Sequence, residues 1–597
     1  MLSTNRIILI AFGLAVVSCH AASEDTRQLA LLGGTILDGT GAPEVTNGVV
    51  IVNGDRISCI GSSADCAVPT RAEIIDVTGK WVTPGLVDSH VHFSQTGWFD
   101  GRPDGIDATE VFPYVGVASK LREQPERFYR SYLCSGVTAV YDVGGHQWTL
   151  SLGTNTENDA DAPHIRAAGS LVTHAGLDIL NADGLNTFLP MSTVAEGRES
   201  VRKLSDWGST AIKVWWIKPA DDEAKTLDEV YLAVADEARA RNLDLIVHVT
   251  TLREAKLAVG AGAQLLVHGV LDDPVDEEFL RAVVENDVVY TPTLVVSSNW
   301  WRALASVALN TPNQANDPNS CVDPDTARKI ADTSILAPYL PEYMSTEQAE
   351  KMLEYVSEYE EFLKSELLKV HAAGITIATG TDAGNPLTLH GASMMDEMLF
   401  MQDAGIPAAE ILVMSTQNGA RAMGRLEDFG TLAPGKIADL LVLGADPSVD
   451  VANFKKLEMV VRAGQPHSIA DLSYGRRCAA SDEPGDVVQA QVEAYNDHDL
   501  DGFLACYADD AAIHDLTGKQ PVIRGQSDIR ETYTFLEHIP EGAGVEIIDR
   551  IISDSIVVDM ERFVGIPEGA VMPDAVAVYE VRDGKIQSVW FPPADVN

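Results

Sequence analysis

The sequence predicts an α/β protein built on a (β/α)8 TIM barrel, with a split β-sandwich domain and a further α+β domain at the C-terminus. Eight short apolar segments alternate with helical patterns, as strands and helices do in such a barrel. The predicted strands are 82–91, 137–143, 165–170, 211–215, 243–249, 264–268, 288–293 and 375–381. Glycine-punctuated strands precede and follow this region, and the C-terminal segment reads as helices followed by alternating strands. A chain of 597 residues is long enough for about three or four domains.

The N-terminal residues 1–19 are expected to be a signal peptide. Arg6 precedes an apolar run that ends at Val17, with the charge order and length of an export signal and too few residues to span a bilayer. The segment up to Cys19 also resembles a bacterial lipobox, in which Cys19 would carry a lipid anchor. The alternative is an ordinary signal peptide cut near Ala21 or Ala22. Under either interpretation we expect an exported protein, in the periplasm or lipid-anchored to a bacterial membrane.

The composition argues against some partners. The formal charge of −45 arises from 88 acidic and 43 basic residues, and such a surface repels nucleic acid and anionic lipid headgroups. We therefore expect no nucleic-acid partner. Beyond the N-terminal segment, no stretch is long and apolar enough for a transmembrane span. A monomer and a homo-oligomer are both compatible with the sequence.

The cysteines are interpreted as structural. Cys59 and Cys66 flank a short Gly-Ser-rich turn and could form a local disulfide in an oxidising compartment. Four others show no metal-ligand spacing: Cys134, Cys321, Cys478 and Cys506.

Changes in sequence pattern predict the domain boundaries. Short strands with glycine-rich turns recur in two distant pieces, which we expect to pair in one β-sandwich. The polar segment after the second piece is typical of a linker. The predicted order is the first β-sandwich piece at 28–81, the barrel at 82–426, the second β-sandwich piece at 427–472, a linker at 473–484 and the α+β domain at 485–597. Residues 297–370 are expected to be an elaborated barrel loop with helices, arranged as a lid.

Six polar residues end apolar strands of the predicted barrel: His90, His92, Lys213, His248, His268 and Asp382. Active sites of TIM barrels lie at the C-terminal ends of the strands. His90 and His92 are two positions apart, so on a strand their imidazoles face the same side and suit a divalent metal. Each residue alone could instead be a core histidine, a paired lysine or a turn-capping aspartate. Together, in this order, they predict a metal centre.

The chain resembles the metal-dependent amidohydrolase superfamily, in the group similar to imidazolonepropionase and to prolidase-like metallopeptidases. The resemblance extends from residue 28 to about residue 470 and is carried by an ordered set of motifs. These include Thr-Pro-Gly-Leu-Val-Asp-Ser-His-Val-His at 83–92, Gly-Val-Thr-Ala-Val-Tyr-Asp-Val-Gly-Gly at 136–145, Ala-Ile-Lys-Val-Trp at 211–215, Gly-Thr-Asp-Ala-Gly-Asn-Pro at 380–386 and Gly-Thr-Leu-Ala-Pro-Gly-Lys-Ile-Ala-Asp at 430–439.

The resemblance implies a binuclear site. Lys213 would be carbamylated and bridge two divalent metal ions, for which Zn2+ is the first candidate. His90, His92 and Asp382 would hold one ion, and His248 and His268 the other, with a metal-bridging hydroxide between them. The two cations would lower the pKa of the shared water, and Asp382 would act as the catalytic proton acceptor and donor.

Departures from the family pattern concern the substrate. Imidazolonepropionase itself lacks the bridging lysine, so Lys213 moves this chain toward the binuclear, peptidase-like members. Trp215 and the following Trp216 could wall an apolar pocket, or pack in the core. The substrate-contact candidates are His146, His174, Trp215 and His390.

The C-terminal segment resembles the SnoaL-like, or nuclear-transport-factor-like, cone-shaped fold. Ala494-Tyr495-Asn496-Asp497-His498-Asp499-Leu500-Asp501 is similar to the opening helix of that family. Its members include enzymes, ligand-binding modules and dimerisation modules. Three polar residues of this segment could line a pocket, although solvated turns are the preferred interpretation: Asp509, His514 and Asp515.

Taken together, the sequence and the resemblance predict a metal-dependent hydrolase that cleaves a C–N amide bond of a small substrate. A dipeptide, an N-acyl amino acid and a cyclic amide are the candidate substrates. The same site could alternatively hydrolyse an ester, a lactone or a phosphotriester. A non-catalytic ligand-binding protein is the alternative from a different class.

Overall fold

The computed structural model describes residues 27–175, 178–182, 184–217, 224–474, 484–496, 498–515, 522–540, 542–565, 574–582 and 584–591. The predicted signal peptide lies outside these residues, as does most of the predicted linker. Within the described ranges, no helix is both long and apolar enough to cross a membrane.

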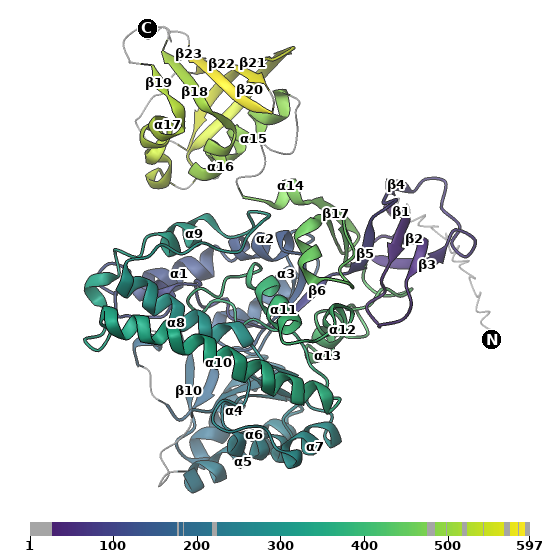
Figure 1. The fold of residues 1–597 in the computed structure, drawn as a ribbon, viewed down its shortest axis with the longest axis vertical. Helices are drawn as coiled ribbons and strands as arrows, with labels where there is room; N and C mark the ends of the chain where they lie inside the picture. The colour runs from purple at the N-terminus through teal and green to yellow at the C-terminus, as the bar shows by residue number, and fades with distance from the viewer. Residues whose placement is uncertain are drawn as a thin grey trace, which may run out of the picture.

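The centre of the molecule is a barrel of parallel strands, which confirms the predicted fold class (Figure 1). Its strands are β6 (Leu86–Val91), β7 (Val137–Asp142), β8 (His164–Ala167), β9 (Leu171–Thr173), β11 (Ala211–Trp215), β12 (Asp244–His248), β13 (Leu265–Val267) and β14 (Val289–Thr291). Because β8 pairs with β7 and β9 pairs with β11, these two short strands together occupy the third position of the barrel. The predicted strand 375–381 takes the eighth position and closes the barrel through isolated parallel bridges at Ile377 and, just beyond it, at Ala383. The Ser89 amide donates to the Thr379 carbonyl at 3.0 Å.

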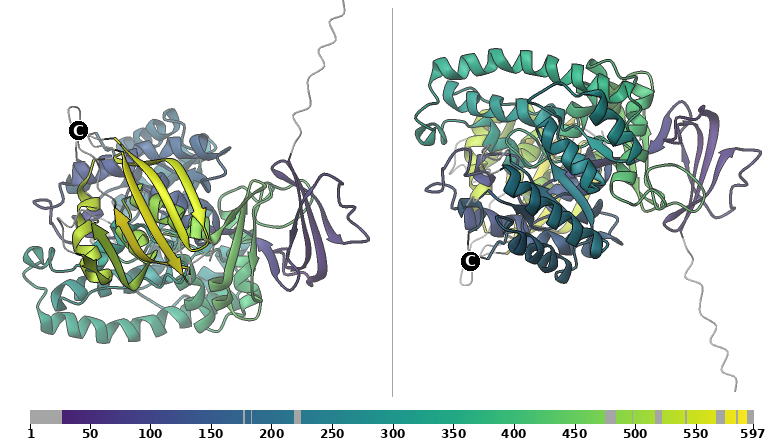
Figure 2. Two further views of the ribbon diagram at one scale, coloured as in Figure 1. Left: turned by 90° about the horizontal axis from the view of Figure 1, so that it is seen from above. Right: turned by 90° about the horizontal axis from the view of Figure 1, so that it is seen from below.

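Helices cover the outside of the barrel. They are α1 (Tyr114–Glu123), α2 (Glu126–Cys134), α3 (Leu152–Thr156), α4 (Val194–Asp206), α5 (Ala224–Ala240), α6 (Leu252–Ala261), α7 (Glu277–Glu285), α8 (Leu294–Leu309), α9 (Pro324–Ala331), α10 (Thr346–Ala372), α11 (Ser393–Asp403), α12 (Ala408–Met414) and α13 (Gln417–Ala422). The long helix α10 packs along α8, and in Figure 2 it runs along one side of the barrel. This pair occupies the segment predicted to elaborate a barrel loop.

The segment 82–91, predicted as one strand, is divided between two sheets. β5 (Trp81–Pro84) pairs with β15 (Leu440–Leu443) in the sheet domain, whereas β6 belongs to the barrel. Gly85 lies at the switch, where a Cβ atom would stand 2.0 Å from the Thr138 hydroxyl of β7. Only glycine allows this close approach of the two strands.

The two predicted pieces of the β domain pair in a single eight-stranded sheet. The N-terminal piece supplies β1 (Gln28–Ile36), β2 (Val45–Asn53), β3 (Arg56–Ser62), β4 (Glu73–Asp76) and β5, and the later piece supplies β15, β16 (Leu457–Arg462) and β17 (Gln465–Ser468). Side chains of both pieces share one apolar core. Figure 1 shows this sheet beside the barrel, on the side of α12.

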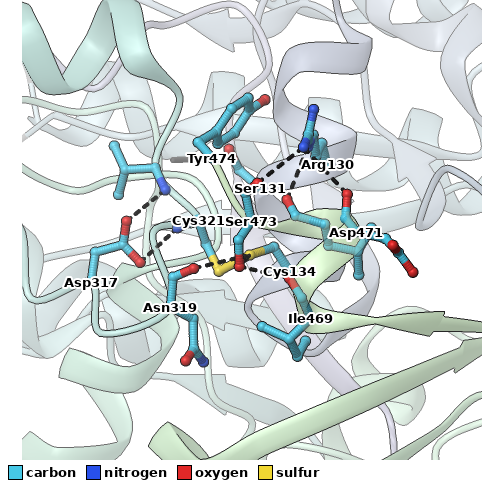
Figure 3. Close-up of a disulfide and its surroundings, with 12 residues drawn as sticks. Arg130, Ser131, Cys134, Asp317, Asn319, Cys321, Ile469, Asp471, Ser473 and Tyr474 are labelled. Carbon is cyan, nitrogen blue, oxygen red and sulfur yellow. Dashed lines mark hydrogen bonds between the residues drawn. A yellow bond between two sulfur atoms is a disulfide. The ribbon is translucent and has the colours of Figure 1, made fainter. Parts of the chain in front are cut away.

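Two disulfides are present among the described residues. Cys59 pairs with Cys66, the local bond that the sequence allowed. Cys134, at the end of α2, pairs with Cys321 across 187 positions of the sequence. Figure 3 shows the surroundings of this second bond, where the Arg130 guanidinium hydrogen-bonds the carbonyl groups of residues 471–473 and lies 4.5 Å from the centre of the Tyr474 ring. The end of the sheet domain, including α14 (Ile469–Leu472), is thereby fixed to α2.

The C-terminal unit is a separate α+β domain with its own core (Figure 1). Its sheet has the order β19-β18-β23-β22-β21-β20, and α15 (Pro484–Asn496), α16 (Leu500–Ala505) and α17 (Gly525–Tyr533) complete it. The strands are β18 (Tyr507–Asp515), β19 (Ile523–Arg524), β20 (Gly544–Ser553), β21 (Ile556–Val564), β22 (Ala575–Arg582) and β23 (Lys585–Phe591). Asp509, His514 and Asp515 lie on β18 rather than in turns, which corrects that interpretation.

Candidate metal centre

The structure brings the six predicted ligands together at the C-terminal end of the barrel. His90 lies on β6 and His92 just after it, Lys213 on β11, His248 at the end of β12, His268 after β13 and Asp382 in the closing segment. All six are buried or nearly so. On β12, Ile246 faces the apolar barrel interior, and the alternation of the strand gives His248 the same face.

Short distances connect these side chains. Asp382 Oδ1 lies 2.8 Å from His92 Nε2 and 3.4 Å from His90 Nε2, and Asp382 Oδ2 lies 3.9 Å from His268 Nδ1. The rings of His268 and His248 have their centres 4.2 Å apart. Ligand atoms of His90, His268 and Asp382 all lie within 4.8 Å of one another, which is the spacing of a metal site.

Two residues of the centre adopt backbone conformations that L-amino acids rarely use. His268 has a φ of 75° and Asp382 a φ of 64°. By strand alternation His268 would face the helices, because Leu266 packs against them and Val267 faces the barrel interior. The left-handed turn instead brings His268 to the centre. Such strain costs about 1–3 kcal/mol per residue and is typical of functional sites.

Outer contacts fix the orientation of the imidazoles. The Nδ1 atom of His92 hydrogen-bonds the Gly144 carbonyl, so its Nε2 carries the free lone pair that faces Asp382. His268 Nδ1 lies 2.7 Å from the Thr293 hydroxyl. A partner on one ring nitrogen that sets the direction of the other is the arrangement that metal-binding histidines usually have.

Asp88 braces the two strands that carry the centre. Its carboxylate accepts hydrogen bonds from the Thr381 amide at 3.0 Å, the Thr381 hydroxyl at 2.7 Å and the His90 amide at 3.2 Å. β6 is thereby joined to the residue that precedes Asp382.

The electrostatics favour neutral imidazoles. Burial, and after it the positive charge of Lys213 or of a neighbouring histidine, lowers the pKa of His90, His248 and His268 well below the usual value. Burial also lowers the pKa of Lys213 to about 8, although Asp382 and Asp142 act in the opposite direction. Neutral imidazoles and a readily deprotonated amine are the forms that can bind a metal.

The donor set fits a divalent metal. Neither ring nitrogen of His90 has a hydrogen-bond partner among the described residues, although both atoms are buried. An unsatisfied buried imidazole is costly, and a metal ion would satisfy it. Imidazole nitrogens combined with a carboxylate are ligands that suit zinc.

The centre opens into a cavity of about 530 Å³. Lys213, His248, His268 and Asp382 form part of its floor, and aromatic side chains form much of its wall. The aromatic residues are Tyr114, Phe188, Trp215, Trp300, Trp301, Tyr355 and Tyr359. Four of these come from α8 and α10, so the elaborated loop does contribute to the site.

The four substrate-contact candidates occupy different places. Trp215 lines the cavity, stacked on Phe188 with ring centres 5.3 Å apart. His146 is buried behind Tyr114, whose hydroxyl lies 3.1 Å from its Nε2. His174 is half-buried after β9 and is not among the described residues that line the cavity.

His390 lies behind the centre. Its ring stacks on Phe128, with centres 3.7 Å apart, and its Nε2 lies 3.1 Å from the His92 carbonyl. It is not among the described residues of the cavity wall, so its contacts fit the positioning of His92 rather than contact with a substrate. Trp216, in contrast to Trp215, packs in the core against Tyr231, with ring centres 4.2 Å apart.

Sequence reasoning missed a polar chain that runs from the cavity wall to the centre. Arg102 donates to the Asn385 side-chain oxygen, and the Asn385 amide donates to Asp382 Oδ1 at 2.8 Å. Arg102 also pairs with Asp104 at 2.7 Å and lies over the Trp300 ring. The loop between β6 and α1 that carries Arg102 has no pattern pointing to the site. Asn385 follows three residues after Asp382, and that proximity was the available signal.

Comparisons with known proteins agree with this geometry. Residues 81–466 match the model of the amidohydrolase family, and the chain therefore belongs to that family. Membership of this family makes the chain a hydrolase that acts on carbon–nitrogen bonds. Residues 488–589 match the model of the SnoaL-like domain.

Individual relatives share only limited sequence identity with this chain. A stretch of 118 residues is 31% identical to an imidazolonepropionase of Pseudomonas savastanoi pv. phaseolicola, but it spans 17% of this chain and only 29% of that protein. An imidazolonepropionase of Geobacillus sp. is 23% identical over 462 residues, which span 72% of this chain and 90% of that protein. A crystal structure of a Xaa-Pro dipeptidase with bound methionine in the active site shares the fold, with a TM-score of 0.54 and 21% identity, over 74% of this chain and 100% of that one.

Proposed function

We propose that this protein is a metal-dependent hydrolase that cleaves a C–N amide bond of a small substrate. The observation that carries the proposal is the convergence of four imidazoles, one carboxylate and a buried lysine at the C-terminal end of the barrel, where all but His90 line one cavity. His90, His92, Asp382, His248 and His268 would hold two divalent ions, and a carbamylated Lys213 would bridge them.

When bound, the ions would supply a hydroxide near neutral pH and polarise the substrate carbonyl. The residues of the chain have separate tasks. Asp382 would accept the proton of the attacking water and deliver it to the leaving amine. The neutral amine of Lys213 would add to CO2 and lose a proton, which yields the carbamate anion. Its partly lowered pKa makes the neutral amine accessible at physiological pH.

The cavity supports a substrate with an aromatic or large apolar group. Trp215, Trp301 and Tyr359 provide flat apolar walls. Besides Lys213 and the histidines, Arg102 is the basic residue among the described ones that line the cavity. Asp104 and Asn385 hold one N–H of each of its three nitrogens, which leaves two N–H groups for a substrate carboxylate. An N-acyl amino acid or a dipeptide has both features. The Xaa-Pro dipeptidase that shares the fold acts, as its name says, on dipeptides.

We also propose that the protein is exported. The two disulfides among the described residues support an oxidising compartment, because such bonds are rare in the cytosol.

A substrate panel tests the proposal. Metal-loaded protein is assayed against N-acyl amino acids with aromatic side chains, the same compounds with an amidated carboxyl, and the corresponding esters. We expect cleavage of the free acids, and a rise in KM on amidation or in an Arg102→Met variant. Asp382→Asn should lower kcat by about 10²–10⁴-fold.

Cleavage of the esters without turnover of any amide would contradict the proposal and show that the protein is an esterase. No turnover of any compound by protein that contains metal would contradict hydrolysis altogether. Arg122→Met, at an exposed position of α1, serves as the matched control for Arg102→Met.

A further inference from the structure

The C-terminal domain contains a second cavity, of about 400 Å³, which has no role in the proposed hydrolysis. Nearly all of its lining is apolar or aromatic, and among the described residues of that lining a single side chain is charged, Glu561. The aromatic members are Tyr495, Tyr507, Tyr533, Phe535, Phe563, Tyr579 and Phe591. Cavities of this size and character typically bind small organic molecules.

Glu561 is one of two acidic residues on the inward face of β21. β21 alternates between buried and more exposed residues, and its inward face carries Val557, Asp559 and Glu561 in succession. Acidic residues on an inward face need a partner, because an unpaired buried charge is costly. The two acids differ in how this need is met.

Asp559 is paired within the domain. Arg550, opposite it on β20, contacts both of its carboxylate oxygens at 2.7 and 2.6 Å. Among the described residues, Glu561 has no ion pair of this kind. Its Oε1 accepts a hydrogen bond from the Tyr579 hydroxyl at 2.9 Å. A neutral phenol does not compensate a full negative charge.

The groups that face Glu561 in the cavity are phenols and aromatic faces, while the mutually paired Asp559 and Arg550 act on it through their charges from outside the cavity lining. Tyr495 on α15, Tyr507 on β18, Tyr533 on α17 and Tyr579 on β22 all lie near enough for its charge to contribute to their raised pKa values, for which burial is the main cause. In the part of the chain that the structure describes, no lysine, arginine or histidine lines the cavity. Aromatic faces attract cations, and the carboxylate does so more strongly.

We propose that this cavity binds a small apolar or aromatic molecule that carries one protonated amine, with the amine placed against Glu561. The apolar part of the ligand would contact Val492, Phe563 and Phe591, and the ammonium would supply the missing counter-charge. This site is independent of the metal centre, so it stands or falls separately from the proposed hydrolase.

Calorimetric titration of the full-length protein tests the inference. The probes are 1-naphthylmethylamine and its neutral counterpart 1-naphthylmethanol, at pH 8. We expect the amine to bind at least about 10-fold more tightly, as for a charge-assisted hydrogen bond in a buried site. Glu561→Gln should remove this preference and leave the affinity for the alcohol within about 3-fold. The matched control, Glu546→Gln on the exposed face of β20, should change neither.

Two further measurements keep the test decisive. Val564→Trp, at the partly exposed rim, should weaken binding of both probes, whereas Trp301→Ala in the barrel cavity should not. If Glu561→Gln fails to fold, the wild-type protein is titrated from pH 6 to pH 8, where amine affinity should rise as the Glu561 carboxyl ionises while alcohol affinity stays constant. Equal affinity for the two probes at pH 8, or amine binding that survives Val564→Trp, would overturn the inference.

Discussion

The two cavities of this protein solve the problem of buried charge in different ways. In the barrel, Asp382 lies among imidazoles and a buried lysine, and we propose divalent metal ions as its counter-charge. In the C-terminal domain, Glu561 is surrounded by phenols, and the missing charge is positive and single. On these two proposals, the side chains around a buried acid, rather than the acid itself, decide which cation its cavity binds.

The largest expected effect comes from Lys213→Ala. Removing the bridging group should abolish measurable hydrolysis, and acetate or propionate added at high concentration should restore some of it by occupying the vacated position. Amine binding in the C-terminal domain should be unchanged. Lys203→Ala, on helix α4, is the control. Full activity in the Lys213→Ala variant would remove the lysine from the proposed mechanism.

Chelation should also separate the two cavities. If the free metal concentration is about 100 to 1,000 times the Kd of the folded barrel, removing the metal lowers the free energy of unfolding by about 3–4 kcal/mol. Differential scanning calorimetry with and without chelator should show this loss in the transition of the barrel and none in that of the C-terminal domain. A shift of both transitions, or of neither, would contradict the comparison.

The next effect concerns the pH dependence of the C-terminal domain. Burial raises the pKa of Glu561 to about 7, from 4.5, although the Tyr579 hydroxyl and the charge of Arg550 act in the opposite direction. Its contribution to stability is therefore complete below pH 4.5 and is lost as the pH rises through about 7, by on the order of 3 kcal/mol. Glu561→Gln should flatten the dependence of the unfolding free energy on pH and stabilise the domain at pH 8. An unchanged pH profile in this variant would show that Glu561 ionises freely.

The smallest effect on metal binding is expected from substitution of Thr293, whose hydroxyl positions the His268 imidazole and does not line the cavity. Thr293→Val removes the hydroxyl at His268 Nδ1 and should weaken metal affinity by about 10–100-fold. Thr293→Ser keeps the hydroxyl and should retain wild-type affinity. Competition with a fluorescent metal indicator measures both. Equal affinities of the two variants would mean that the hydroxyl does not orient the imidazole.

Most of the fold was accessible from the sequence, because its patterns are local. The alternation of apolar strands and helices predicted the barrel, and the glycine-rich turns predicted that distant pieces share a sheet; both are confirmed. The division of 82–91 between two sheets was missed, because a Pro-Gly pair indicates a break in a strand but not the sheet to which each half belongs.

The site was only partly predictable. Residues at strand ends, such as His248, follow from alternation, and the structure does bring the six candidates together. His268 and Asp382 reach the centre through left-handed backbone conformations that alternation cannot predict. Arg102 lies in a loop without periodicity, and the place of His390 behind the centre depends on packing that one sequence does not contain. Glu561 was missed because an acid in an alternating strand reads as solvent-facing.

Metal analysis of the full-length protein, purified without chelator, is the decisive experiment for the proposed metal centre. We expect close to two divalent ions per chain, as in two-metal hydrolytic sites. We also expect a clear loss of bound metal in His268→Ala and no loss in Glu561→Gln. A wild-type protein without stoichiometric metal, or a His268→Ala variant that keeps both ions, would contradict the proposed metal centre.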